Sequence, residues 1–127
     1  MPDLSATGMK IGTLPIVSVG RDGALLGSRR RALQPAGLEV TSLAPEEAEA
    51  MAHETQARLW ILCGTVEPST LVYLACAIRR HSPKSRLLLV EHRIPAGTES
   101  SLFHQILPQD SNASLLTAVV HELSVAA

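Results

Sequence analysis

Short apolar runs alternate with longer segments of helical periodicity along the chain, and this alternation predicts strands and helices in turn. Apolar residues are nearly continuous at 16–19, 58–63 and 87–90, as in strands that are buried on both faces. The segment 38–42 alternates between apolar and polar residues, which is typical of an edge strand with one exposed face. A weaker run at 103–107 completes five predicted strands.

Between the strands, apolar residues at helical spacing predict helices over 24–33, from Pro45 onward, and over about 69–80. A last helix carries the apolar positions 115, 116, 119, 120 and 123, with Ser111 or Asn112 as its N-cap. The segment 93–101 is rich in Gly, Pro, Thr and Ser. We therefore expect the fourth helix, between the fourth and fifth strands, to be short or irregular.

This order of elements predicts an α/β fold. Strands that are apolar on both faces and alternate with helices form a parallel sheet between two helical layers. Right-handed crossovers then favour a flavodoxin-like, doubly wound sandwich with a five-stranded sheet in the order 2-1-3-4-5. We expect an N-terminal tail over residues 1–13, one domain over 14–127, and no second domain.

Composition narrows the functional classes. A formal net charge of −1 provides no field that would attract nucleic acid or an anionic membrane, and no stretch is apolar for long enough to span a bilayer. Arg29, Arg30 and Arg31 point in three directions on a helix, so we expect them to be solvated. Cys63 and Cys76 predict two reduced, largely buried thiols in a cytoplasmic protein.

Three longer stretches resemble the receiver domain of response regulators, the CheY-like module of two-component signalling. PIVSVGRDGALLGSRRRALQPAGLEVTSL is similar to the first strand, the first helix and the turn into the second strand of a receiver. AIRRHSPKSRLLLV resembles the end of the third helix with the fourth strand, and SNASLLTAVVHEL resembles the terminal helix. The resemblance implies the CheY-like form of the predicted fold and a signalling function through protein contacts.

The residues that a working receiver needs are missing from the matching positions. Such a domain holds Mg²⁺ with two acids, phosphorylates an aspartate, and places a threonine or serine and a lysine beside it. The matching positions hold Gly20 and Arg21, with Asp22 one residue late, then Cys63, Glu91 and Leu107-Pro108-Gln109. The resemblance therefore implies a degenerate receiver, or pseudo-receiver, that is not an enzyme. It would require no cofactor and would not be switched by aspartyl phosphorylation.

Besides a catalytic role for the Cys63 thiol, two further uses of these strand ends stay open. The first is a vacated pocket that senses a small molecule, an anion or an oxidant, because a nearby cation activates a thiol. Its residues would be Gly20, Arg21, Cys63 and Glu91. The second is a zinc site built from Cys63, Glu91, His92 and Asp22, although their spacing matches no closed site.

The surface most suited to a partner lies on the last helix and beside the fifth strand. If the terminal helix cannot bury both of its apolar rows, one row is left for a protein partner. The candidate residues are His104, Leu115, Leu116, Val119 and Val120. In receivers this region forms the dimerisation and output surface. The resemblance therefore implies a protein partner of a signalling pathway, including a second copy in a homodimer, and neither nucleic acid nor a membrane.

Overall fold

One parallel sheet organises the molecule. The computed structural model describes residues 13–53, 56–63, 65–90, 103–107 and 113–126. The strands are β2 (Thr13–Val19), β3 (Val40–Leu43), β4 (Gln56–Cys63), β5 (Arg86–Val90) and β6 (Gln105–Leu107). Each neighbouring pair is parallel, and the order across the sheet is β3-β2-β4-β5-β6. Counted along the chain this is the order 2-1-3-4-5, so the predicted doubly wound fold is confirmed.

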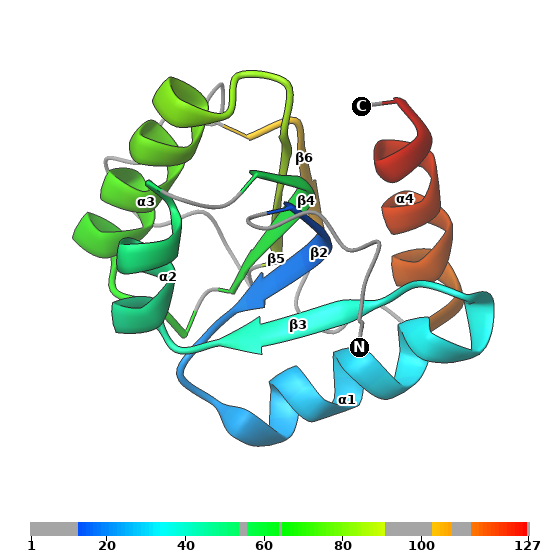
Figure 1. Cartoon of the computed structure of the whole chain (residues 1–127). Coiled ribbons are helices and arrows are strands. Elements are labelled where there is room, and N and C mark those ends of the chain that lie inside the picture. The colour runs from blue at the N-terminus through cyan, green and yellow to red at the C-terminus, as the bar shows by residue number, and fades with distance from the viewer. Residues whose placement is uncertain (1–12, 54–55, 64, 91–102, 108–112, 127) are drawn as a thin grey trace, which may run out of the picture.

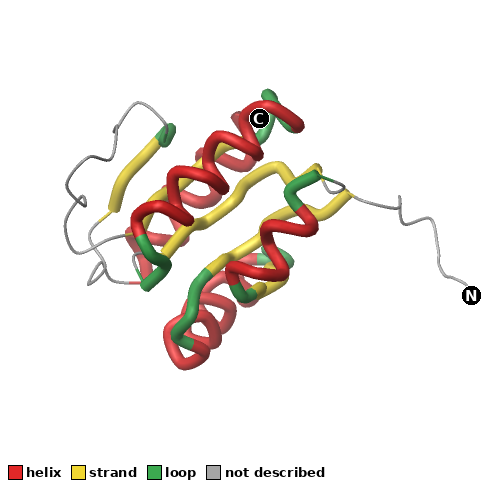
Figure 2. The backbone as a smooth tube through the Cα atoms, turned by 90° about the vertical axis from the view of Figure 1, so that its left-hand side faces the viewer, coloured by secondary structure: helices red, strands yellow, loops and turns green. Residues whose placement is uncertain are grey.

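Helices cover both faces of this sheet (Figure 1). In the described ranges they are α1 (Gly23–Leu33), α2 (Pro45–Met51), α3 (Pro68–His81) and α4 (Ala113–Ala126), and a 3-10 turn over Gln34–Ala36 follows α1. α2 and α3 pack on one face of the sheet, whereas α1 and α4 pack on the other. After a turn of 90°, the strands are seen running among helices on both sides (Figure 2).

The sheet divides the apolar core into two halves. On one side, Trp60 of β4 is fully buried and packs with residues of α2 and α3. On the other side, the next residue, Ile61, packs with Leu33 of α1 and Val120 of α4. Consecutive residues that enter opposite halves of the core follow the period of two of a strand buried on both faces. β4 is therefore the central strand, as its continuous apolar run predicts.

Two helices begin at the prolines that the sequence places there. Pro45 is the first residue of α2, and the Glu47 carboxylate accepts a hydrogen bond of 2.9 Å from the backbone N–H of Ala44. Pro68 is the first residue of α3. Proline suits this position because its fixed φ is already helical and the missing N–H has no partner within the helix. Both starts lie at the carboxyl end of the sheet.

The start of β3 differs from the prediction. The strand begins at Val40, two residues later than the alternating pattern suggested. Gly37 adopts a φ of 80° at the end of the 3-10 turn, and the N–H of Leu38 still donates to the carbonyl of Leu33. The turn therefore holds the backbone of residue 38 outside the sheet, although the side chain of Leu38 packs against the core.

Two burial predictions are wrong. Arg29 is only 6% exposed, because it shares the inner face of α1 with Leu26 and Leu33 at helical spacing. Arg30 and Arg31, which lie on the outer face, are exposed as predicted. Cys76 is exposed rather than buried. It lies on the solvent side of α3, which turns Leu71, Leu74, Ala75, Ala77 and Ile78 toward the core.

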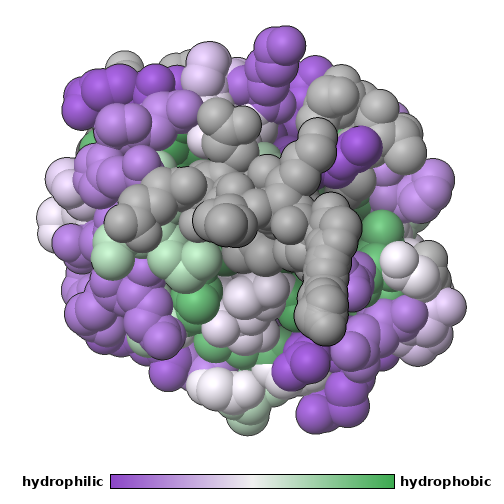
Figure 3. All heavy atoms as spheres, viewed as in Figure 1, coloured by the Kyte–Doolittle hydropathy of each residue, from purple (hydrophilic) through white to green (hydrophobic). Residues whose placement is uncertain are grey.

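Several predicted features lie outside the described residues, namely the irregular helix at 93–101 and the caps Ser111 and Asn112. None of the helices that the structure describes is long and apolar enough to cross a membrane. Hydrophilic side chains predominate around the rim of the face in Figure 3, with hydrophobic ones showing between them.

Candidate functional site

The carboxyl ends of β2 and β4 lie side by side and bring the predicted strand-end residues together. Val19 of β2 pairs with Leu62 of β4, so Gly20 and Cys63 follow at the same edge of the sheet. The N–H of Gly20 donates to the carbonyl of Leu43 at 3.2 Å, which ties this end of β2 to β3 as well. In open α/β sheets this edge is where ligands usually bind.

The Cys63 side chain is enclosed. It has no exposed area, and its Sγ accepts a hydrogen bond of 3.3 Å from the Thr65 hydroxyl. A Cβ atom at Gly20 would lie 3.0 Å from the Cβ of Cys63 and 3.2 Å from the Thr65 oxygen. The close approach of Cys63 and Thr65 therefore leaves little room for a side chain at position 20. The Cys63 thiol is thus not exposed at this edge, whereas Glu91, another residue of the predicted pocket, lies outside the described residues.

Arg21 lies at the same edge but points toward two carboxylates. Its Nε is 2.9 Å from Oε2 and 3.1 Å from Oε1 of Glu67, and its Nη2 is 2.9 Å from Oε1. Its Nη1 lies 3.0 Å from Oε2 of Glu46. The backbone N–H of Arg21 donates to the Thr65 hydroxyl at 3.0 Å. One arginine therefore joins the end of β2 to the start of α2 and the start of α3.

Electrostatics of this group follow from the same contacts. The hydrogen bonds to Glu67 and then to Glu46 raise the pKa of Arg21 above its ordinary value. The pKa of Glu67 is lowered by Arg21 and by its own backbone N–H, and the pKa of Glu46 is lowered by its own backbone N–H and by Arg21. All three side chains are exposed, so water screens the ion pairs and they add little stability. Their main effect is to hold the end of β2 beside the starts of α2 and α3.

This arrangement argues against Arg21 as an anion receptor. An added anion would have to displace carboxylates that already occupy the Nε, Nη1 and Nη2 atoms. The bidentate geometry with Glu67 is the form of arginine–carboxylate pair with the greatest directional specificity. The prediction of an anion sensor built on Arg21 is therefore not supported by its contacts.

Asp22 serves the backbone of α1. It is the N-cap of that helix, and its Oδ1 accepts hydrogen bonds of 2.9 and 3.2 Å from the N–H groups of Ala24 and Leu25. Glu91, His92 and Pro108 lie outside the described residues. Among the residues that the structure does describe, no three His, Cys, Asp or Glu side chains converge as a metal site would require.

The two apolar rows of α4 differ in burial. Leu116 and Val120 are 7% and 0% exposed and belong to the core, which removes them from the predicted partner surface. Leu115 is 45% exposed, and Val119 is half-buried at the edge of the core. The row that begins at Leu115 is therefore the one that faces outward.

His104, the remaining member of the predicted partner surface, is exposed and forms hydrogen bonds to Leu87 of β5. Its ring Nδ1 accepts a hydrogen bond of 2.9 Å from the backbone N–H of Leu87, and the backbone N–H of His104 donates to the carbonyl of Leu87 at 2.8 Å. Desolvation lowers the pKa of His104, and the nearby charges of Arg86 and Arg79 lower it further. The neutral ring that this hydrogen bond requires is thus favoured.

Sequence reasoning missed Thr65, Glu46 and Glu67. A signal was present for the two acids, because both lie beside a proline that begins a helix, Pro45 and Pro68. Helices that follow parallel strands all begin at the carboxyl edge of the sheet, so acids in their first turns share an edge with Arg21. Nothing in the sequence pattern indicated which of these acids Arg21 would bind.

No family model and no curated protein matches this sequence. Solved structures do match its fold. The response regulator TrrA from Thermotoga maritima, with Mg²⁺ and BeF, is 18% identical with a TM-score of 0.76, over 87% of this chain and 98% of that one. TrrA is also known in complex with the histidine kinase ThkA.

Two further structures extend the comparison. A CheY-like receiver domain protein from Methanospirillum hungatei is 17% identical with a TM-score of 0.70, over 89% of this chain and 95% of that one. An adenylate cyclase from Rhodopirellula baltica is 18% identical with a TM-score of 0.75, over 90% of this chain and 87% of that one. These similarities establish the CheY-like fold for this chain.

Proposed function

We propose that this chain is a pseudo-receiver, a receiver-like domain of two-component signalling that acts through protein contacts and is not switched by aspartyl phosphorylation. The observation that carries the proposal is the state of Cys63 at the carboxyl end of β4. A phosphoacceptor must be an exposed carboxylate beside a bound divalent cation. Cys63 instead has a thiol without exposed area, which accepts a hydrogen bond from Thr65.

The neighbours of Cys63 support the same reading. Gly20 offers no side chain, and Arg21 engages Glu46 and Glu67, two carboxylates at this edge that could otherwise bind Mg²⁺. The carboxylate that follows Arg21 in the sequence, Asp22, caps α1. Mg²⁺ prefers oxygen ligands, and a guanidinium repels it.

The proposal is tested by incubating the chain with acetyl phosphate and Mg²⁺ and measuring its intact mass. We expect no phosphoryl adduct, and we expect beryllofluoride with Mg²⁺ to leave the thermal midpoint unchanged. A working receiver treated in the same tube serves as the positive control. A stoichiometric adduct that survives at neutral pH and is mapped to an aspartate or glutamate of this chain would overturn the proposal.

For the protein contact, the outward row of α4 is the candidate surface. Leu115 is the most exposed apolar residue of that row, and a leucine exposed to nearly half its area gains free energy when a partner covers it. The partner would be a signalling protein or a second copy of this chain. Light scattering on the wild type and on Leu115→Glu distinguishes these cases. A dimer that the substitution dissociates identifies self-association, whereas two monomeric proteins point to a different partner.

A further inference from the structure

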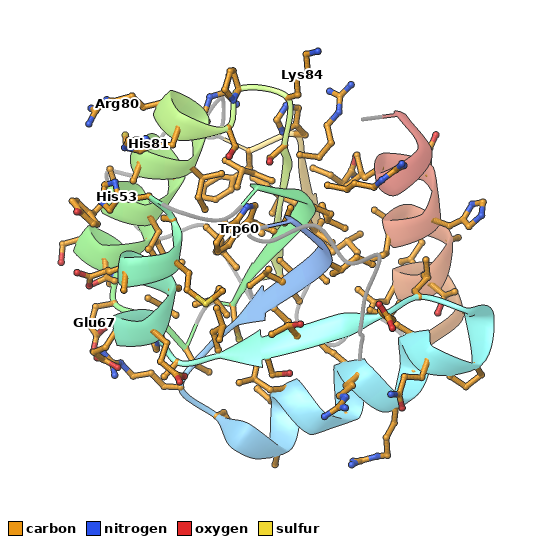
Figure 4. All side chains as sticks on the ribbon, viewed as in Figure 1. His53, Trp60, Glu67, Arg80, His81 and Lys84 are labelled. Atoms are coloured by element: carbon orange, nitrogen blue, oxygen red, sulfur yellow. The ribbon has the colours of Figure 1, made fainter. Side chains whose placement is uncertain are left out.

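Two histidines and a tyrosine meet on the surface of the α2–α3 layer. His53 lies just after α2, His81 is the last residue of α3, and Tyr73 lies about two turns earlier on α3. In Figure 4, His53 and His81 are labelled beside α3, near the end opposite Glu67. This group therefore lies away from the strand ends discussed above, and the proposed function does not use it.

The geometry of the pair is close. His53 Nδ1 and His81 Nε2 are 2.7 Å apart, the ring centroids are 4.5 Å apart, and the ring planes cross at 86°. The Tyr73 hydroxyl lies 3.5 Å from the other nitrogen of His53, Nε2. All three side chains are exposed, so an ion from solution can reach them.

The protons on the His53 ring can be arranged in two ways. In one tautomer Nδ1–H of His53 donates to Nε2 of His81, and Nε2 of His53 accepts from Tyr73. In the other, Nε2–H of His53 donates to the Tyr73 oxygen and Nδ1 of His53 carries a lone pair. His81 Nε2 then either donates its own N–H to that lone pair or, when the His81 proton lies on Nδ1, presents a second lone pair to it. Two lone pairs that face each other without a proton repel, and a cation between them removes the repulsion.

We propose that His53 Nδ1 and His81 Nε2 bind a borderline divalent transition-metal ion, of the class of Ni²⁺ and Zn²⁺. Imidazole nitrogens are preferred ligands of these ions, with metal–nitrogen distances of about 2.0–2.1 Å. Two such bonds at ordinary coordination angles need the nitrogens roughly 3.0–3.4 Å apart, so the pair must open by about half an ångström. Rotation of two exposed side chains supplies this movement.

Tyr73 has the role of an outer-shell partner. Histidines that bind metals usually donate their second ring N–H to an oxygen, which fixes the tautomer and the orientation of the ring. Tyr73 accepts from Nε2–H of His53 in the tautomer that frees Nδ1 for the ion. In the part of the chain that the structure describes, no third His, Cys, Asp or Glu joins the pair. The ion would link the end of α2 to the end of α3.

The test uses nickel chloride as the probe, on the full chain in a Cys76→Ser background that removes the exposed thiol as a competing ligand. We expect Ni²⁺ to raise the thermal midpoint and equilibrium dialysis to find one ion per chain. His53→Gln and His81→Gln should each abolish the shift and weaken binding at least tenfold, because either change removes half of the chelate. Both side chains are exposed, so both variants should fold.

His121→Gln is the matched control, because His121 is an exposed histidine on α4, on the opposite face of the sheet. It should keep the full shift and one bound ion per chain. Tyr73→Phe should weaken binding roughly tenfold without changing the stoichiometry. Equal binding by the wild type, His53→Gln and His81→Gln, or loss of binding in His121→Gln, would overturn the assignment.

Discussion

The close approach of Gly20 to β4 can be tested with a single methyl group. In Gly20→Ala the new Cβ would lie 3.0 Å from the Cβ of Cys63 and 3.2 Å from the Thr65 oxygen. Carbon atoms pack best at about 3.5–4.0 Å, so the neighbouring atoms must move by a few tenths of an ångström. Cys63 has little room to move, because it is fully buried and β4 pairs with β2 on one side and β5 on the other.

Overpacking of this kind costs about 1–3 kcal/mol. Replacing glycine also lowers the entropy of the unfolded chain, which stabilises the folded state by about 0.4–1 kcal/mol. We therefore expect a net destabilisation of about 1–2 kcal/mol. Gly23→Ala is the matched control, since a Cβ at this first residue of α1 would meet nothing within 4 Å. That variant should be as stable as the wild type or more stable, by up to about 1 kcal/mol.

Urea unfolding followed by Trp60 fluorescence measures the difference, because the chain has a single tryptophan and it is fully buried. The thermal midpoint of Gly20→Ala should fall by a few degrees, since about 1 kcal/mol corresponds to roughly 3–5 °C in a chain of this size. If Gly20→Ala proves as stable as Gly23→Ala, the space beside Cys63 is open and the reasoning for a closed strand edge fails.

Three further predictions test the burial and charge assignments. With Cys76→Ser, the remaining thiol, Cys63, should react with Ellman's reagent at least tenfold more slowly in native than in urea-unfolded protein, and equal rates would show an accessible thiol. Because Arg21 lowers the pKa of Glu67 below its ordinary 4.5, the wild type should be more stable than Glu67→Gln at neutral pH. That advantage should disappear as the pH falls below 4.5 through the lowered pKa, and an advantage that persists at pH 2 in thermal melts would contradict the ion pair. Val120→Ala should cost about 2 kcal/mol in urea unfolding, from two lost methyl groups and a cavity, whereas a loss under 0.5 kcal/mol would place this residue outside the core.

The fold could be predicted because its signals are local. The continuous apolar run of β4 indicates a strand buried on both faces, and Pro45 marks the start of α2. Parallel strands joined by helices leave few topologies, which is why the strand order followed as well. The start of β3 was misplaced because alternation of apolar residues does not reveal that a 3-10 turn continues through Gly37.

Burial of single polar residues was harder to predict. Arg29 shares an inner face with Leu26 and Leu33, and that spacing was present in the sequence. Three consecutive arginines nevertheless suggested a solvated segment, because arginine is counted as a charged residue. Its long aliphatic stem can still pack in the core, which allows one of the three to be buried. Cys76 was misjudged for the opposite reason, since cysteine is usually buried and its neighbours on α3 are apolar.

The contacts of Arg21 could not be predicted, because its partner Glu67 is 46 positions away and meets it only after the crossover through β4. These contacts also bear on the proposed function. Replacing Cys63 by aspartate would place one carboxylate in a space closed by Gly20 and Thr65. It would not supply the acids that a divalent cation needs, since Arg21 holds Glu46 and Glu67, and Asp22 holds the start of α1. Under the proposed function, receiver chemistry at this strand edge would therefore require removal of the arginine and addition of acids, together with an aspartate at position 63.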